Sequence, residues 1–255
     1  QIQLGKWDLA VQTLQESAKR WPDKRPDSIL FWLGEAYTRG NQFAEAESRY
    51  AEVLEKFPRT MHLTGALYGL AFAQIKQGRL AQAGDTLDKL AKVQPRGDAE
   101  FESDLLRAQL HLARKDFAAA EKTLAAIAAK AGTTRAFYRA NYWFAESLQY
   151  RRDFTNALAR YAVVTDTFVA KPNKPVDAQL AAEAWFGTGW TQWQLGWFQT
   201  AAGSFESALT NAVTAPLKRD ALLKLAESQA RAGKVADGVA RLKEFLRQHP
   251  ADSVA

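Results

Sequence analysis

Apolar residues along the chain follow a helical period inside a longer repeat. A large residue is followed three positions later by a small residue, and four positions after that by a second large residue. This spacing places all three side chains on one face of an α-helix. The pattern occurs seven times, with first positions at Trp7, Phe43, Leu80, Phe117, Phe154, Phe198 and Val235.

The same register holds at the other two positions of the pattern. The small residues are Ala10, Ala46, Ala83, Ala120, Ala157, Ala201 and Gly238, and the second large residues are Leu14, Tyr50, Leu87, Leu124, Tyr161, Phe205 and Leu242. The period is about 37 residues, which is longer than the common 34-residue helical repeat. One interval is longer still, and we place its extra residues in a loop at 171–175, where two prolines interrupt the pattern.

Each copy of the pattern is preceded by another helical stretch, so the repeating unit is helix, turn, helix. In the clearest copy, Gly40-Asn41 interrupts the helical pattern and Pro58 follows the second helix, which it cannot continue. Gly34 and Ala46 are small where the two antiparallel helices must cross closely, and Tyr50 fills the space beside them. Runs of alternating Val and Ile are few, so strands are not expected.

Three further glycines fall inside predicted helices, where glycine costs about 1 kcal/mol relative to alanine. They are Gly187, Gly189 and Gly203. We attribute all three to close approach of a neighbouring helix. They do not open a helix after a strand, so they do not form a phosphate-binding loop.

On these residues the chain resembles the tetratricopeptide repeat proteins, over nearly its whole length. Trp185 occupies the family's tryptophan position, whereas His111 stands where the family has tyrosine. The resemblance implies an all-α, right-handed superhelix of paired helices in a single domain, with ligands held in a groove lined by first helices. The expected parts are a half-repeat at 1–26 and repeats at approximately 27–63, 64–100, 101–137, 138–181, 182–218 and 219–255.

The resemblance extends to a subgroup. Repeats that end in Arg20-Trp21-Pro22, Lys56-Phe57-Pro58 and Gln248-His249-Pro250 are similar to bacterial envelope members, such as the Tol-Pal accessory and outer-membrane assembly lipoproteins. This favours the bacterial periplasm or cell envelope as the location. The chain begins at Gln1 and with the second helix of a repeat, so a processed or excised product with uncapped ends is expected.

Composition excludes several classes of site. The chain has no cysteine and three histidines, so disulfides, thiolate nucleophiles and cysteine-type zinc sites are excluded. His111 falls at a core position, His62 in a turn and His249 at a helix end, which favours structural roles. No apolar run is long enough to span a membrane. We therefore expect a protein that is not an enzyme and that needs no cofactor or metal.

The first helices supply the candidate binding residues, because their inner faces would line the groove. The candidate residues are Phe31, Glu35, Tyr68, Phe72, Gln109, Tyr142, Glu146, Trp190, Trp193 and Glu227, with Ile75, Leu105, Leu112, Gln149, Phe186 and Leu223 on the same predicted face. Aromatic residues suit an apolar or amphipathic protein segment. The recurring glutamates suggest that this segment carries some Lys or Arg. The alternative is that several of these aromatics pack against the next repeat.

Two other function classes remain open at this point. A structural platform would join its own copies through the uncapped ends, giving a homo-oligomer. A nucleic-acid binder would use the net charge of +6, but no regular pair of base-reading residues recurs in each repeat. Because 28 acidic residues are interspersed with 34 basic ones, the charge is better explained by a solvated helical surface than by nucleic acid.

Overall fold

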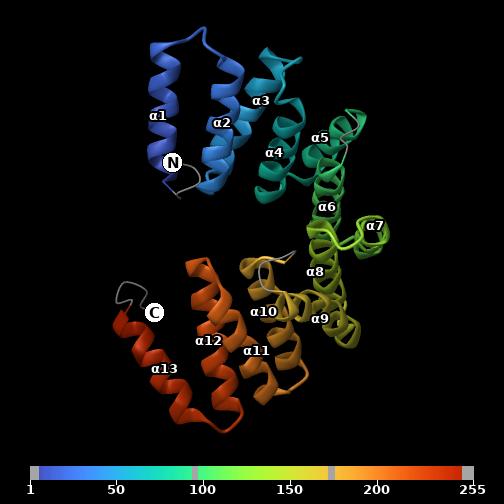
Figure 1. Ribbon diagram of the computed structural model, residues 1–255, viewed down its shortest axis with the longest axis vertical. Coiled ribbons are helices and arrows are strands. Elements are labelled where there is room, and N and C mark those ends of the chain that lie inside the picture. The colour runs from blue at the N-terminus through green and yellow to red at the C-terminus, as the bar shows by residue number, and fades with distance from the viewer. Residues whose placement is uncertain (1–5, 94–96, 172–175, 249–255) are drawn as a thin grey trace. The chain divides into compact units, whose positions relative to one another are not determined.

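The protein is all-helical. The computed structural model describes residues 6–93, 97–171 and 176–248, and within these ranges it contains thirteen α-helices and no strand (Figure 1). By compactness the chain divides into two units, Gln1–Thr123 and Leu124–Ala255. The expected all-α fold is confirmed, whereas the predicted single-domain division into six repeats and a half-repeat stays a prediction.

The first unit is built from consecutive antiparallel helices. They are α1 (Trp7–Arg20), α2 (Pro26–Arg39), α3 (Phe43–Lys56), α4 (Leu63–Lys76), α5 (Leu80–Lys92) and α6 (Asp98–Ala113). The division between the units falls within α7 (Phe117–Lys130). The second unit contains α8 (Arg135–Tyr150), α9 (Phe154–Ala170), α10 (Ala178–Gln194), α11 (Phe198–Asn211), α12 (Ala215–Arg231) and α13 (Val235–Gln248).

The sequence markers coincide with helix starts. Trp7, Phe43, Leu80, Phe117, Phe154, Phe198 and Val235 are the first residues of α1, α3, α5, α7, α9, α11 and α13. The small residue one turn later is buried in every case. An alanine or glycine there lets the partner helix approach closely, which a larger side chain would prevent.

The turn after each first helix has one repeated geometry. In the α2–α3 turn, the amide of Asn41 donates to the carbonyl of Thr38 and the amide of Gln42 donates to that of Tyr37. These two bonds define a Schellman motif, which needs a left-handed residue, and Asn41 has φ of 59°. The equivalent residues with positive φ are Gly78, Lys115, Arg152, Gly196 and Gly233.

Aromatic residues of the second helices occupy the space that glycines leave on the first helices. A Cβ atom at Gly34 would lie 2.7 Å from the Tyr50 ring, and one at Gly69 would lie 2.4 Å from it. Both distances are shorter than any normal contact, so Tyr50 packs between the helix of its own pair and that of the next. In the second unit Gly187 receives Tyr161 in the same way.

The close-approach prediction holds at two of the three mid-helix glycines. A Cβ at Gly187 would meet Tyr161, and one at Gly189 would come within 2.9 Å of the Phe205 ring. The prediction is wrong for Gly203, which is exposed and has nothing within 4 Å of the position that its Cβ would occupy.

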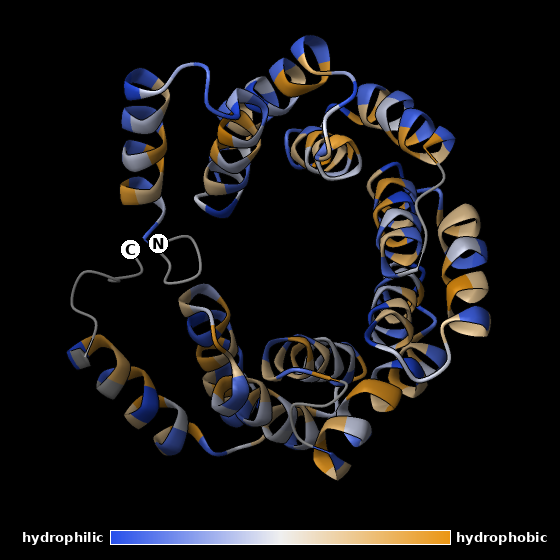
Figure 2. Ribbon diagram, turned by 45° about the horizontal axis from the view of Figure 1, so that its top comes forward, coloured by the Kyte–Doolittle hydropathy of each residue, from blue (hydrophilic) through white to orange (hydrophobic). Residues whose placement is uncertain are grey.

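Each unit has its own apolar cores, centred on these interlocking positions. Tyr50 and Leu87 are fully buried in two clusters of the first unit, and Tyr161 and Phe205 in two clusters of the second. Figure 2 shows hydrophilic and hydrophobic residues sharing the same helices, as expected for helices with one buried side. The predicted loop at 171–175 lies almost wholly outside the described residues, as does His249.

Candidate functional site

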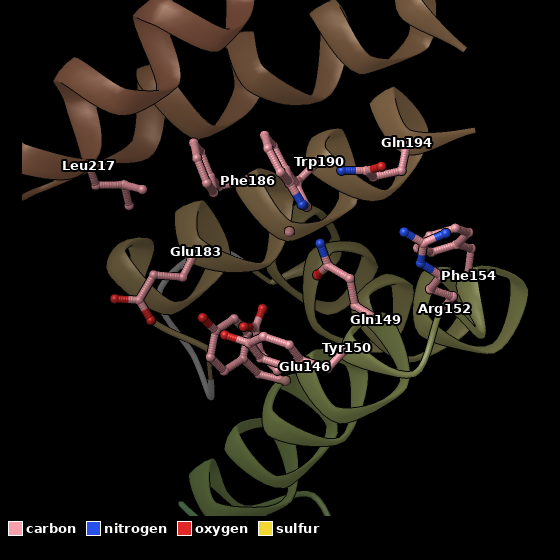
Figure 3. Close-up of a pocket in the computed structure, with 12 residues that line it drawn as sticks. Glu146, Gln149, Tyr150, Arg152, Phe154, Glu183, Phe186, Trp190, Gln194 and Leu217 are labelled. Atoms are coloured by element: carbon pink, nitrogen blue, oxygen red, sulfur yellow. The ribbon is translucent and has the colours of Figure 1, made fainter. Parts of the chain in front are cut away.

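A cavity of about 540 Å³ lies in the second unit (Figure 3). Its residues come mainly from two first helices, α8 and α10, which therefore present their inner faces to the same space. The lining residues are Tyr142, Glu146, Gln149, Tyr150, Arg152, Phe154, Glu183, Phe186, Gly187, Trp190, Gln194 and Leu217.

Helical spacing brings these residues together. On α8, Tyr142, Glu146 and Tyr150 are four residues apart, so they form one stripe along the helix. On α10, Glu183 and Trp190 lie on a similar stripe, together with the residues between them that line the cavity. Five of the lining residues are aromatic, which gives the cavity largely apolar walls. Such a cavity can bury an apolar or amphipathic side chain.

One carboxylate of the site is held by a phenol from the neighbouring second helix. Glu146 Oε1 accepts a hydrogen bond from the hydroxyl of Tyr161, and the side-chain oxygen of Gln149 lies 2.7 Å from the same hydroxyl. A phenol has only one proton to donate, and the carboxylate is the stronger acceptor. Turning the Gln149 amide over would let its NH₂ group donate to Tyr161 instead.

Burial changes the acidity of this group. It raises the pKa of the Glu146 carboxyl, the hydrogen bond from Tyr161 acts in the opposite direction, and the nearby charge of Glu183 raises it further. Burial also raises the pKa of Tyr142, with smaller contributions from the two glutamates. The cavity therefore places a carboxyl group and a phenol where their charged forms are poorly solvated. Figure 3 shows Arg152 on the far side of the cavity from Glu183.

Trp190 belongs to a second arrangement on α10 and α12. Its indole stacks on that of Trp193, with ring centroids 5.6 Å apart and an interplanar angle of 8°. Lys224 Nζ lies 4.7 Å from the Trp190 ring and 5.2 Å from the Trp193 ring, and it forms an ion pair of 2.8 Å with Glu227. The guanidinium of Arg231 lies 5.4 Å from the Trp193 ring. This cluster joins aromatic faces, an ammonium and a carboxylate.

Three residues of the sequence-predicted set therefore meet at the cavity, namely Tyr142, Glu146 and Trp190. Gln149 and Phe186, from the wider set, line it as well. Trp193 packs beside the cavity rather than lining it, and Glu227 is paired with Lys224.

In the first unit, several of the predicted binding residues also contact other residues of the protein. Phe31 stacks on His62, with centroids 4.5 Å apart and an angle of 9°, and Glu35 accepts a hydrogen bond of 2.7 Å from the hydroxyl of Tyr50. Tyr68 and Phe72 pack against a buried cluster, with part of each side chain exposed.

Three further residues, Leu105, Gln109 and Leu112, were assigned to the groove face on α6. Gln109 is half-buried on this helix. The expectation that Leu105 faces the groove is wrong, because this residue is fully buried.

Some of the residues that sequence reasoning missed lie within one turn of residues that it found. Glu183 precedes Phe186 by three positions, and Gln194 follows Trp190 by four, so extending the same stripe on α10 would have included both. Arg152, Phe154 and Leu217 come from turns or helix starts, where a helical stripe carries no information. Their convergence depends on the packing of three helix pairs.

The described residues show neither a metal-binding cluster nor a membrane-spanning helix. No group of three or more His, Asp or Glu side chains there is arranged to hold a metal ion. His111 Nδ1 lies 3.7 Å from Asp116 Oδ2, and His62 Nε2 lies 2.9 Å from the hydroxyl of Ser28. No helix in the described part of the chain is long and apolar enough to cross a membrane.

Solved structures resemble this chain at low sequence identity. A chain of the APC/C hetero-tetramer Cut9–Hcn1 matches with a TM-score of 0.72 and 14% identity, and the match covers 99% of this chain and 45% of that one. PilW, a type IV pilus biogenesis factor, matches with a TM-score of 0.65 and 15% identity over 90% of this chain and 96% of that one. NprR in complex with its cognate peptide NprX matches with a TM-score of 0.58 and 14% identity, over 97% and 77%.

Sequence models give the family. No curated protein matches the sequence. One model described as a tetratricopeptide repeat matches residues 1–60 and 142–216, which is more than half of the chain, and two others match 42–103 and 220–252. Together with the helix pairs and their shared turns, these matches show that the chain belongs to the tetratricopeptide repeat family.

Proposed function

We propose that this chain is a non-enzymatic protein–protein interaction scaffold that binds a peptide or protein segment on its first-helix faces. The observation that carries the proposal is the cavity between α8 and α10. Its volume of about 540 Å³ lies within the usual range for ligand sites, roughly 300–1,000 Å³, and its apolar walls carry a few polar groups. This combination anchors a side chain by burial and orients it by hydrogen bonds.

The family supports this kind of function. Tetratricopeptide repeats are typically interaction scaffolds, and the NprR structure holds a peptide on a similar fold. The cavity lacks the histidine, cysteine or metal cluster that would activate a nucleophile or a water molecule. Binding, rather than catalysis, is therefore the activity that its side chains support.

A second stretch of the proposed binding surface lies in the first unit. Tyr68 and Phe72 of α4 are half-exposed, and Phe31, Glu35 and Gln109 lie on the other first helices of that unit. Lys76 Nζ lies 5.3 Å from the ring of Phe72, so this aromatic face already has a cation over it. We assign these residues a secondary role, because several of them also stabilise the core.

The chemistry of the cavity favours a segment with apolar and some basic residues. Two carboxylates line it, which disfavours the phosphates of a nucleic acid. The bacterial envelope location expected from the repeat ends stays a prediction of the sequence. The identity of the partner is the question that an experiment must answer.

The test is an affinity capture from native extract, followed by selection from a displayed library of random dodecapeptides. Two variants probe the cavity. Trp190→Ala removes an aromatic wall, and Gln194→Trp places a bulky ring at an exposed lining position without entering the core. Truncating an interface hot spot typically costs about 2 kcal/mol or more in binding. We expect both variants to lose at least tenfold in affinity for the selected peptides.

The matched control is Trp197→Ala, since Trp197 is 53% exposed and does not line the cavity. Melting curves must show that Gln194→Trp is folded like the parent. The double variant Trp190→Ala with Trp193→Ala extends the test to the stacked pair. If all variants capture the same proteins and peptides as the parent, the cavity is not the binding site. Self-association through the ends would then be examined by sedimentation.

A further inference from the structure

Arg152 is the one basic side chain among the described residues that line the cavity. It is exposed, and its side chain forms no hydrogen bond, ion pair or ring contact with another residue in the described part of the chain. Every other arginine described in the second unit interacts with another residue, as Arg135 does with Asp177. The guanidinium of Arg152 therefore has its donors free for a ligand at the cavity.

The backbone of Arg152 has a conformation that favours glycine. Its φ is 63°, and its amide donates to the carbonyl of Gln149 in the turn between α8 and α9. Glycine occupies the same turn position at Gly78, Gly196 and Gly233. A side chain at this position brings Cβ close to the following carbonyl oxygen, a strain that glycine avoids. The protein thus places an arginine at the cavity where glycine would give the more stable turn.

A second hydrogen-bond donor lines the same part of the cavity. The side chain of Gln194, at the end of α10, is exposed and forms no hydrogen bond with another described residue. Figure 3 shows Gln194 and Arg152 on the side of the cavity away from Glu183. A guanidinium donates two parallel hydrogen bonds to a carboxylate, and a side-chain amide can donate a further one. This end of the cavity therefore suits an anionic acceptor.

We propose that Arg152 determines specificity by binding the carboxylate of an aspartate or glutamate side chain in the bound segment. Gln194 donates a further hydrogen bond to the same carboxylate. The aromatic walls formed by Phe186 and Trp190 bury an apolar residue of the segment, so the cavity recognises an apolar residue close to an acidic one. Basic residues of the segment are accommodated at the opposite end, where Glu183 lies.

Other groups fit this end of the cavity less well. A lysine or arginine of the segment would place a second positive charge beside Arg152, which is unfavourable at short range. A neutral amide could accept a hydrogen bond from Arg152, but bonds between two ionised groups are the stronger ones. The fixed fork of the guanidinium also matches the two oxygens of a carboxylate better than the single oxygen of an amide.

This inference rests on the proposed function, and its test separates the two. Dodecapeptides selected on the parent protein are synthesised with amidated C-termini, and each is compared with a version in which its acidic residue becomes the corresponding amide. Fluorescence titration gives the affinities for the parent, Arg152→Gly, Arg152→Lys and Gln194→Trp. We expect aspartate or glutamate to be enriched at one position. The amide version should bind the parent at least fivefold more weakly, and the two versions should bind Arg152→Gly equally. Arg152→Lys should keep part of the preference, because it keeps the charge but not the fork.

The matched control is Lys115→Gly. Lys115 occupies the same turn position in the first unit, with φ of 60°, and does not line the cavity. Both glycine variants should melt about 2–4 °C above the parent, because they relieve the same backbone strain. Only Arg152→Gly should lose the preference for the acidic peptide. Loss of binding in a more stable variant cannot result from unfolding.

The outcomes are distinct. Acidic and amide peptides that bind the parent equally, but do not bind Gln194→Trp, would overturn the role of Arg152 and leave the binding site in place. The same conclusion follows if Arg152→Gly keeps the preference for the acidic peptide, or if binding needs a free C-terminal carboxylate instead of an acidic side chain. Peptides that bind Gln194→Trp as tightly as the parent would overturn both proposals.

Discussion

The hydroxyl of Tyr161 donates a hydrogen bond to Glu146 and so ties α9 to the first helix of its own pair. The same bond, 2.7 Å long, joins Tyr50 to Glu35 three pairs earlier. In both places a tyrosine that packs against at least one glycine presents its hydroxyl to a glutamate of the first helix. Repeat packing thus positions the carboxylate of the candidate site.

Replacing Tyr161 by Phe should destabilise the protein by about 1–3 kcal/mol at neutral pH, because the buried Glu146 loses its hydrogen-bond donor. Tyr50→Phe should behave similarly through Glu35. Urea unfolding measures both effects. Tyr37→Phe is the control, since the Tyr37 hydroxyl only accepts a bond of 3.2 Å from exposed Gln15. Equal losses for all three variants would contradict a special role for the buried bonds.

Replacing a glycine by alanine in α10 and in α11 should change the stability of the protein in opposite directions. Gly187→Ala should destabilise the second unit, because the added Cβ would lie 2.4 Å from the Tyr161 ring. Gly203→Ala should stabilise it by about 0.5–1 kcal/mol, since the position is helical and open, and alanine is the better helix former. Thermal unfolding of the two variants checks the prediction. A loss of stability at Gly203 would mean that a neighbour contacts it.

The sequence predicted the fold well because the period of the pattern is set by local packing. All seven markers begin helices, and small residues such as Ala46 and Ala157 are fully buried. The site was only partly predictable. A helical stripe located Tyr142, Glu146 and Trp190, but it could not show that Trp193 would turn toward Lys224 and Arg231. That depends on the angle between neighbouring helices, which no single repeat encodes.

The small positions of the second helices give a third prediction. Ala46, Ala120 and Ala157 have no exposed surface, so replacing any of them by Leu should overpack a helix crossing and cost on the order of 1–3 kcal/mol. Chemical unfolding measures the cost. Glu45→Leu and Ala118→Leu are the controls, because both positions are exposed.

Ala119 does not serve as a control. This residue is partly buried, although it directly precedes the small position of its repeat. If the control variants lose as much stability as the three alanine variants, the assigned helix register is incorrect.

The last prediction concerns pH. Burial raises the pKa of Glu146 above its ordinary value of 4.5, so the folded protein holds this proton more tightly than the unfolded chain does. Below pH 4.5 the carboxyl is mostly protonated in both states, so it does not oppose folding. As the pH rises through the raised pKa, ionisation of the buried group lowers the free energy of unfolding. Glu146→Gln removes the charge but keeps an oxygen that can accept from Tyr161. We expect this variant to be more stable than the parent at pH 7 and to lose that advantage at pH 4.

Asp27 provides a control of opposite sign. The hydrogen bond from Thr60, 2.7 Å long, lowers the pKa of the Asp27 carboxyl below its ordinary value of 3.8. Its contribution to stability is present above pH 3.8 and is lost only as the pH falls through the lowered pKa. Asp27→Asn should therefore be less stable than the parent at both pH 7 and pH 4. If urea unfolding shows Glu146→Gln to be less stable than the parent at pH 7, then the charged form of Glu146 is compensated in the folded protein.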